Sequence, residues 1–104
     1  LQDFDYYEIH EAFAAQVLGC QAAWQSDDYC REQLELSGAL GTIDDEKLNV
    51  DGGAVAIGHP VGASGARIVL HLLHVLRRNK ARRGIATICI GGGLGGAMLV
   101  ESLN

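Results

Sequence analysis

Cys89 is the residue of this sequence best placed to do chemistry. It lies near the end of residues 84–90 (GIATICI), a β-branched and apolar run that predicts a buried strand. Ligands of α/β sheets bind at the carboxyl ends of strands, so the thiol is expected where a substrate would lie. Glycines crowd residues 91–96 (GGGLGG), and residues 97–101 are predicted to form a second strand. We therefore predict a tight glycine turn that lets backbone approach a bound molecule beside Cys89.

The glycine run also matches the dinucleotide fingerprint G-x-G-x-x-G, at Gly91, Gly93 and Gly96. That fingerprint opens a helix and is followed about 20 residues later by an acidic side chain. Here a predicted strand follows the glycines instead. The match is therefore weak.

A second candidate, His59, is held between a glycine and the only proline of the chain. Pro60 has a fixed φ and favours an extended backbone at the residue before it. A helix is predicted from residue 66 to about residue 79, with Ser64 or Gly62 near its N-cap. Free amides at such a helix start favour an anion or an oxyanion. The Lys-Ser/Thr pair of a nucleotide P-loop is missing, which argues against that alternative.

His10 and Glu11 lie where a predicted strand, residues 5–10, passes into a predicted helix. Taken alone, a polar pair at a strand end is most often a cap or a turn. A lone Cys89 would likewise be a small core hydrophobe, and a lone His59 a loop residue. Their functional interpretation depends on their occurring together.

The predicted elements alternate between strands and helices, which is typical of an α/β fold. The helix at residues 66–79 is apolar in nearly every direction, and we expect such a helix to be buried on all sides. Its His71 and His74 are interpreted as packing residues rather than a metal pair, and the acidic residues 44–46 as a solvated turn. In chain order we predict a strand at 5–10, a helix at 11–24, a charged helix-loop insert at 27–47, a strand, the helix at 66–79, a strand at 84–90, the glycine turn and a strand at 97–101.

Composition limits the partners. With 104 residues the chain forms one domain at most, and a net charge of -5 argues against nucleic acid. Basic residues gather at 77–83, where they complement a helix end; binding of a ligand's phosphate groups is a lesser alternative. Three irregularly spaced cysteines predict no disulfide framework, hence a reducing compartment, cytoplasmic in a bacterium or mitochondrial, and not a secreted protein. No apolar run approaches the roughly 18 residues of a membrane span.

Three blocks, in this order, resemble the C-terminal catalytic half of the thiolases, the acyl-CoA C-acyltransferases. The resemblance covers residues 4–101 and implies the C-terminal half of the thiolase fold: α/β, a mixed sheet with packed helices in α-β-α layers. In that family two such halves stack, which would put the helix at 66–79 in a central layer. The blocks are residues 10–13 (HEAF), similar to the family's Asn-Glu-Ala-Phe, residues 58–60 (GHP) followed by 62–65 (GASG), and residues 89–93 (CIGGG), similar to Cys-x-Gly-Gly-Gly.

The resemblance implies thiolytic cleavage of a 3-ketoacyl-CoA by CoA to acetyl-CoA and a shortened acyl-CoA, or the reverse Claisen condensation. Cys89 would be the acid/base, and His59 would activate a nucleophilic cysteine and donate to the enolate oxygen. Gly91 would offer its backbone N–H to the other oxyanion. His10 would orient a water molecule or donate directly. A thiol with a pKa of about 8.5 can exchange a proton with so weak a carbon acid only if the enolate is stabilised.

Two departures from the family pattern matter. His10 in place of asparagine, and the insert at 29–49, resemble the trifunctional-enzyme β-subunits, whereas residues 89–93 resemble the short-chain acetoacetyl-CoA thiolases; both subfamilies stay open. The family's nucleophilic cysteine lies in the N-terminal half, and neither Cys20 nor Cys30 has a comparable setting. Residues 1–104 are thus expected to be a thiolase C-terminal domain truncated on its N-terminal side and inactive alone.

The resemblance also implies the partners of the whole enzyme. CoA and acyl-CoA are expected as substrates, with no cofactor and no metal. The full-length protein is expected to be a homodimer or homotetramer, within a multienzyme complex if it is of the trifunctional type. Three alternatives remain: a zinc site formed by His10, His59 and Cys89; a ketoacyl synthase, which shares the fold but not the second cysteine followed by glycines; and a noncatalytic thiolase-like interaction module.

Overall fold

A three-stranded mixed sheet organises the chain. The computed structural model describes residues 1–103, and in it β1 (Tyr6–Ile9), β2 (Arg83–Gly91) and β3 (Leu94–Glu101) lie in that order. β1 pairs with β2 in parallel and β2 with β3 antiparallel, with Glu8 opposite Ala86 and Cys89 opposite Gly95. The predicted mixed sheet and α/β class are confirmed.

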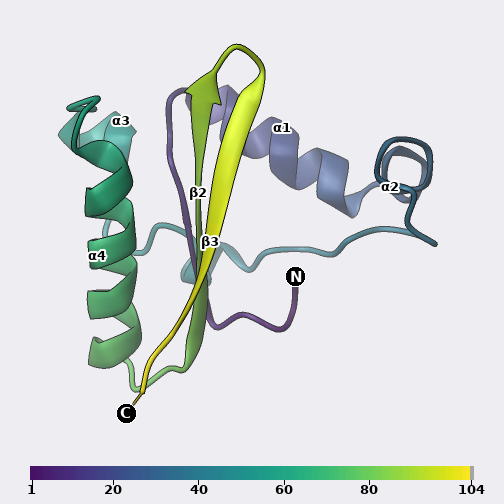
Figure 1. Cartoon of the computed structure of the whole chain (residues 1–104). Helices are drawn as coiled ribbons and strands as arrows, with labels where there is room; N and C mark the ends of the chain where they lie inside the picture. Colours follow the sequence, from purple (N-terminus) through teal and green to yellow (C-terminus); the bar gives the residue numbers. More distant parts are fainter. Residues whose placement is uncertain (104) are drawn as a thin grey trace.

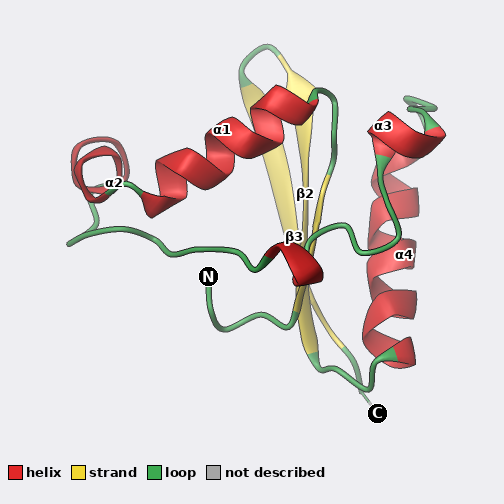
Figure 2. Ribbon diagram, turned by 180° about the vertical axis from the view of Figure 1, so that it is seen from behind, coloured by secondary structure: helices red, strands yellow, loops and turns green. Residues whose placement is uncertain are grey.

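Helices lie on both faces of this sheet (Figures 1 and 2). The helix α4 (Ser64–Arg78) covers one face, and α1 (Ala14–Gln25) crosses the other near the β2–β3 turn. Three short helices, α2 (Asp27–Leu34), η1 (Asp45–Lys47) and α3 (Ala54–Ile57), lie in the connection between them. The result is the predicted α-β-α layering around a narrow sheet.

The face under α4 contains one of two cores. Leu72 and Leu76 are fully buried and pack on Ala86 of β2, while Tyr6 and Val100 border the cluster. The opposite face contains the other core, formed by Tyr7, Ile9, Val17 and Ile43. Because alternate residues of a strand point to opposite faces, Tyr6 and Glu8 share the α4 face of β1.

The helix α4 is not apolar in every direction, and within residues 1–103 it is buried on one side only. Leu72 is completely buried, whereas Leu70 is 58% and Leu73 40% exposed. Polar residues recur at 67, 71, 74 and 78, a spacing that places them along one side of a helix. This polar side of α4 contacts the segment before α3, where Nη2 of Arg78 lies 3.0 Å from Oδ2 of Asp51 in an ion pair.

The close packing of α4 on β2 depends on one glycine. A Cβ atom at Gly84 would lie 2.7 Å from Cδ1 of Leu72, a distance that real Cβ atoms do not tolerate. Leu72 is fully buried and has little room to give way. The absence of a side chain at residue 84 therefore sets how near the helix comes to the sheet.

The strand predicted before the long helix does not form. Asn49 instead fastens this segment to β1, because its side chain accepts from Ile9 N at 2.8 Å and donates to Ile9 O at 2.9 Å. Only isolated bridges form on either side of Asn49, and Gly53 precedes the single turn of α3. Side-chain pairing at Asn49 replaces the ladder hydrogen bonds that a further strand would make.

Two other boundaries differ from prediction. α1 begins at Ala14, not at residue 11, because Phe13 is extended and the Glu11 carboxylate accepts from Val55 N at 3.3 Å. The hairpin turn is only Gly92 and Gly93, whose φ values of +61° and +76° are the pattern of a type I′ turn. β3 therefore starts at Leu94, within the predicted glycine connection. The acidic residues 44–46 form the expected exposed turn.

Within residues 1–103, no helix combines the length and the apolarity that crossing a membrane requires.

Candidate functional site

Cys89 lies at the carboxyl end of β2, as predicted, and is exposed. A β-bulge interrupts the pairing of β2 with β3 between Cys89 and Gly91. Such bulges re-aim side chains and are common beside active sites. The local sequence thus places this thiol on an accessible rim, where a bound molecule can reach it.

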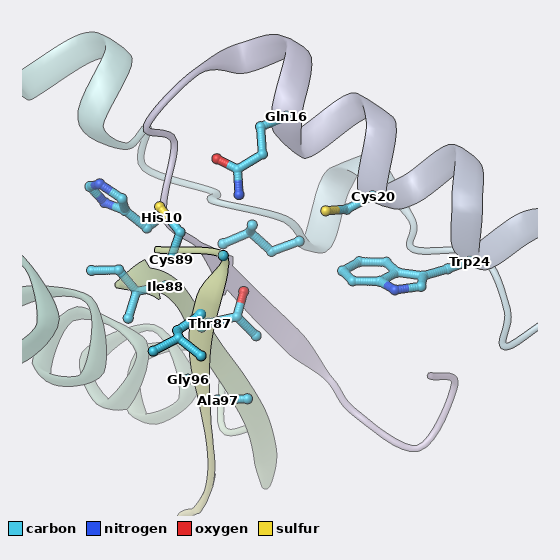
Figure 3. Close-up of a pocket in the computed structure, with 13 residues that line it drawn as sticks. His10, Gln16, Cys20, Trp24, Thr87, Ile88, Cys89, Gly96 and Ala97 are labelled. Atoms are coloured by element: carbon cyan, nitrogen blue, oxygen red, sulfur yellow. The ribbon is translucent and has the colours of Figure 1, made fainter. Parts of the chain in front are cut away.

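An open cavity of about 410 Å³ adjoins the thiol (Figure 3). β1 contributes Ile9, β2 contributes Thr87 and Cys89, and the residue after β1, His10, completes that side. α1 forms the opposite wall with Gln16, Cys20 and Trp24. Figure 3 shows the His10 ring beside the Cys89 sulfur, with the Gln16 amide facing them from α1. Gln16, which carried no signal in the sequence beyond its helix, thus joins the candidate site.

His10 is held by its backbone and left free at its ring. Its N–H donates to Thr87 O at 2.9 Å, which extends the parallel pairing beyond β1. The residue is only 3% exposed, yet neither ring nitrogen has a hydrogen-bond partner within residues 1–103. Burial lowers the pKa of His10, the charges of His59 and Arg67 lower it further, and Glu11 acts in the opposite direction. These effects favour the neutral imidazole, which can both donate and accept.

His59 lies against His10. The two ring centroids are 4.2 Å apart, with the planes tilted by 51°. Nδ1 of His59 is 2.6 Å from Oγ of Ser64, and that hydroxyl donates to Pro60 O at 3.2 Å. A hydroxyl has one proton, so both contacts are made only if His59 Nδ1–H donates to Ser64. In the neutral ring, that assignment leaves the proton on Nδ1 and a lone pair on Nε2, which can then act as a base.

Ser64 is a functional residue that the sequence placed only near a helix start. It is fully buried, and α4 begins at it with Ala63 as an N-cap that makes no side-chain hydrogen bond. The Ser64 hydroxyl therefore binds the His59 ring and does not cap the helix. His59 and Ser64 are five residues apart and meet through the turn between them, in which Ser64 N donates to Pro60 O at 2.9 Å.

The remaining predicted site residue, Gly91, ends β2 with φ +101°, a conformation that other residues rarely adopt. It does not line the cavity beside Cys89. The structure thus brings together His10 and His59 directly, and Cys89 with His10 across one cavity. Gly91 follows Cys89 along the same strand end.

A second, smaller cavity of about 90 Å³ lies on the α4 side of β1. Glu8, His10, Arg67 and His71 line it. Glu8 is 5% exposed, and its pKa is raised to about 7, first by burial and then by the nearby carboxylates of Asp51 and Glu11. Sequence reasoning gave Glu8 no role.

The two histidines of α4 do not form a metal pair. His71 Nε2 lies 2.8 Å from Oδ2 of Asp51, an ion-pair distance, although the ring is not aligned for a hydrogen bond. His74 is exposed, so its interpretation as a packing residue is wrong. In the described part of the chain, no three His, Cys, Asp or Glu side chains gather in a group that could hold a metal ion.

Comparison with known proteins identifies the family of this chain. The sequence model of the thiolase C-terminal domain matches residues 1–102. The chain belongs to this family. The thiolase domain is 45% identical over 102 residues to a probable 3-ketoacyl-CoA thiolase of Caenorhabditis elegans and 45% identical over 101 residues to a 3-ketoacyl-CoA thiolase of Serratia proteamaculans. These matches cover 98% and 97% of the thiolase domain.

A solved structure agrees. The acetyl-CoA acetyltransferase of Bacillus anthracis superposes with a TM-score of 0.73 at 43% identity, over 99% of the thiolase domain. The domain covers 22% of that chain and 23% of the two related sequences. It thus spans less than a quarter of the length of the proteins that it matches.

Proposed function

We propose that this thiolase domain supplies the acid/base half of an acyl-CoA C-acyltransferase. The reaction would be cleavage of a 3-ketoacyl-CoA by CoA to acetyl-CoA and a shortened acyl-CoA, or the reverse condensation. The observation that supports it best is the meeting of His10 and His59 at 4.2 Å beside a cavity that His10 shares with Cys89. Membership of the thiolase C-terminal family adds to it.

In this proposal Cys89 exchanges the proton on carbon. During cleavage, the bond between the α and β carbons breaks, its electron pair passes to the acetyl-CoA enolate, and the Cys89 thiol protonates that carbon. During condensation, the Cys89 thiolate removes the same proton. The exposed strand-end position of the thiol suits contact with such a substrate.

His59 would act as base and donor. With Nδ1 engaged by Ser64, Nε2 takes the proton from a nucleophilic cysteine supplied outside these residues and then donates to the enolate oxygen. His10 would orient a water molecule at that oxygen or donate to it directly. Gly91 would offer its N–H to the oxyanion of the acyl-enzyme, a role that its positive φ and neighbouring bulge suit. Fixed donors aimed at developing charge are typically the largest contribution to such catalysis.

CoA and acyl-CoA would be the substrates, with no further cofactor, because proton transfer and thioester exchange need only these side chains. The whole enzyme is proposed to be a homodimer or homotetramer in the cytoplasm or mitochondrion, with a multienzyme complex if it is of the trifunctional type. The alternative is a noncatalytic thiolase-like module, which the exposed α4 residues Leu70 and Leu73 would suit as an interaction surface.

The deciding experiment measures CoA-dependent loss of acetoacetyl-CoA and of a longer 3-ketoacyl-CoA. The complete thiolase containing this domain should cleave at least one of them, and Cys89→Ala should abolish turnover while Cys20→Ala, a thiol on α1, retains most of it. The 104-residue chain alone should be inactive, because it supplies no acyl-enzyme cysteine. Turnover by the isolated chain above its Cys89→Ala control would refute the division of roles, and no turnover by the complete protein would favour the noncatalytic module.

A further inference from the structure

Glu8 is a buried acid without a direct partner. The residue is 5% exposed, and its side-chain carboxyl group makes no hydrogen bond or ion pair with any of residues 1–103. Buried carboxyl groups are normally paired or hydrogen-bonded, because removing them from water is costly. The potential cationic partners are engaged elsewhere: Arg67 donates to Gly58 O at 2.6 Å, and His71 lies against Asp51.

His10, like Glu8, is a buried residue whose polar side-chain atoms lack a hydrogen-bond partner within residues 1–103. Both of its ring nitrogens are buried and unpartnered, although the ring contacts His59. Glu8 and His10 are two residues apart along β1 and its extension, so both point to the α4 side, and both line the 90 Å³ cavity. Buried polar groups with no protein partner are commonly bridged by water, and each water needs only about 10–15 Å³ of such space.

We propose that Glu8 is a positioning residue that acts on His10 through water held in this cavity, and so determines which ring nitrogen His10 presents to the reacting atoms. The inference deepens the proposed function and rests on it. It assigns the tautomer of His10, which neither the sequence nor the ring geometry decides.

The direction follows from which group donates. A protonated Glu8 donates to the water, and the water donates to the ring nitrogen on the cavity side. The proton of the imidazole then lies on the other nitrogen, facing Cys89 and His59, where it can donate to an oxyanion. An ionised Glu8 only accepts, which reverses the chain and turns a lone pair toward the developing negative charge. The protonated acid is therefore the form that supports catalysis.

The charges around Glu8 place the loss of its proton, and with it the reversal of the water-mediated hydrogen bonds, near neutral pH. Carboxylates lie near Glu8 in the loop before α3 and at the residue after His10, and cationic or titratable side chains line the shared cavity from α4 and from the residue after β1. Its neighbour on β2 is uncharged Ala86. With burial, the two carboxylates raise the pKa of Glu8 to about 7. The groups are Asp51, Glu11, Arg67, His71 and His10.

The test compares pH profiles of kcat in the complete thiolase. Glu8→Gln replaces the acid with an amide that can donate to the water but cannot ionise. The rate of this variant relative to wild type should rise about tenfold per pH unit above the Glu8 pKa. In the His10→Asn background the same substitution should give a ratio independent of pH, because an amide has no tautomers. Glu46→Gln, an exposed acid on η1, is the matched control and should match wild type throughout.

A purely structural role for Glu8 would lower Tm or kcat without this dependence. The proposal would be overturned if, in the enzyme that retains His10, the ratio of the Glu8→Gln rate to the wild-type rate did not change with pH. It would also be overturned if this ratio rose equally in the His10→Asn background. A high-resolution crystal structure of the complete protein supplies a readout independent of turnover. It should show water within hydrogen-bond distance of both the Glu8 carboxyl and a His10 nitrogen. If the protein cleaves no 3-ketoacyl-CoA, the proposed function fails, and that structure alone decides the Glu8–His10 link: a cavity without such a water refutes it.

Discussion

The two halves of the candidate site are built differently. On the α4 side, His10 is 3% exposed and Ser64 is fully buried, and both contact His59 through its ring or Nδ1. On the β2–β3 side, Cys89 and the glycines after it are exposed and lie at a bulge. The comparison teaches that this chain orients the histidines by its own packing but leaves the thiol on an open rim. Substitutions of the buried residues His10 and Ser64 should affect stability and activity together, and those of exposed Cys89 activity alone.

The largest effect is expected on the reaction rate, where substitutions of His59 and of Cys89 should differ in the steps that they slow. In the complete enzyme, His59→Ala should slow both acyl-enzyme formation and the carbon–carbon step, because one imidazole serves both. Cys89→Ser should slow only the carbon–carbon step, since a hydroxyl is a much weaker acid. We expect losses of about 10²- to 10⁴-fold, the usual contribution of general acid–base catalysis. Stopped-flow measurement of each half-reaction checks this, and blocked acylation with an intact carbon–carbon step in Cys89→Ser would reverse the assignment.

The packing of α4 should show the next largest effect. Leu72→Ala in the 104-residue chain should lower the free energy of unfolding by about 2–5 kcal/mol, because it opens a cavity in a closed core. Leu70→Ala, the matched change on the exposed side, should cost about 0.5 kcal/mol or less. Urea unfolding measures both. Equal costs would mean that a second surface covers Leu70, for instance in a self-associated chain.

Glu8 should make stability depend on pH. Its pKa rises from 4.5 to about 7 on folding, so between these values the folded chain keeps a proton that the unfolded chain has lost. The free energy of unfolding should therefore fall as pH rises through this range and remain lower above it. Glu8→Gln should be more stable than wild type at pH 8, by about 3 kcal/mol at most, and the gain should shrink toward pH 4. Urea unfolding at both pH values, with Glu46→Gln alongside, tests the sign; a gain that does not vary with pH would contradict it.

Ser64→Ala should have a smaller effect, on both catalysis and stability. It removes the acceptor for His59 Nδ1 and frees the ring to turn, which we expect to lower kcat by about tenfold, within the range that misplacement of a catalytic group produces. Ser37→Ala, an exposed serine, controls for the loss of a hydroxyl. A higher KM with an unchanged kcat would argue that Ser64 does not orient His59.

The smallest effect is expected on the open side. Cys89→Ser should change the free energy of unfolding of the 104-residue chain by no more than about 0.5 kcal/mol, because the side chain is exposed and fills no core. Thermal and urea unfolding check this. A cost above about 1 kcal/mol would show that the thiol is packed, and the contrast between the two sides would then be lost.

Local preferences are what the sequence by itself determined. The β-branched residues 84–90 predicted β2 and placed Cys89 at its end, and the consecutive glycines predicted the hairpin turn. The helix at 66–79 was found to within two residues at its start. Each is set by short-range sterics and periodicity, which operate on neighbours in the chain.

Only the tertiary structure decided which residues meet. The contact of His10 with His59, the hydrogen bond from His59 to Ser64 and the burial of Glu8 depend on how β1, α4 and the loop before α3 pack together. Asn49 replaced an expected strand by binding the edge of β1, and Asp51 and its neighbours gave the polar side of α4 a partner. Periodicity reports which face of an element is apolar, whereas the groups that approach that face come from distant parts of the chain, brought there by register and packing.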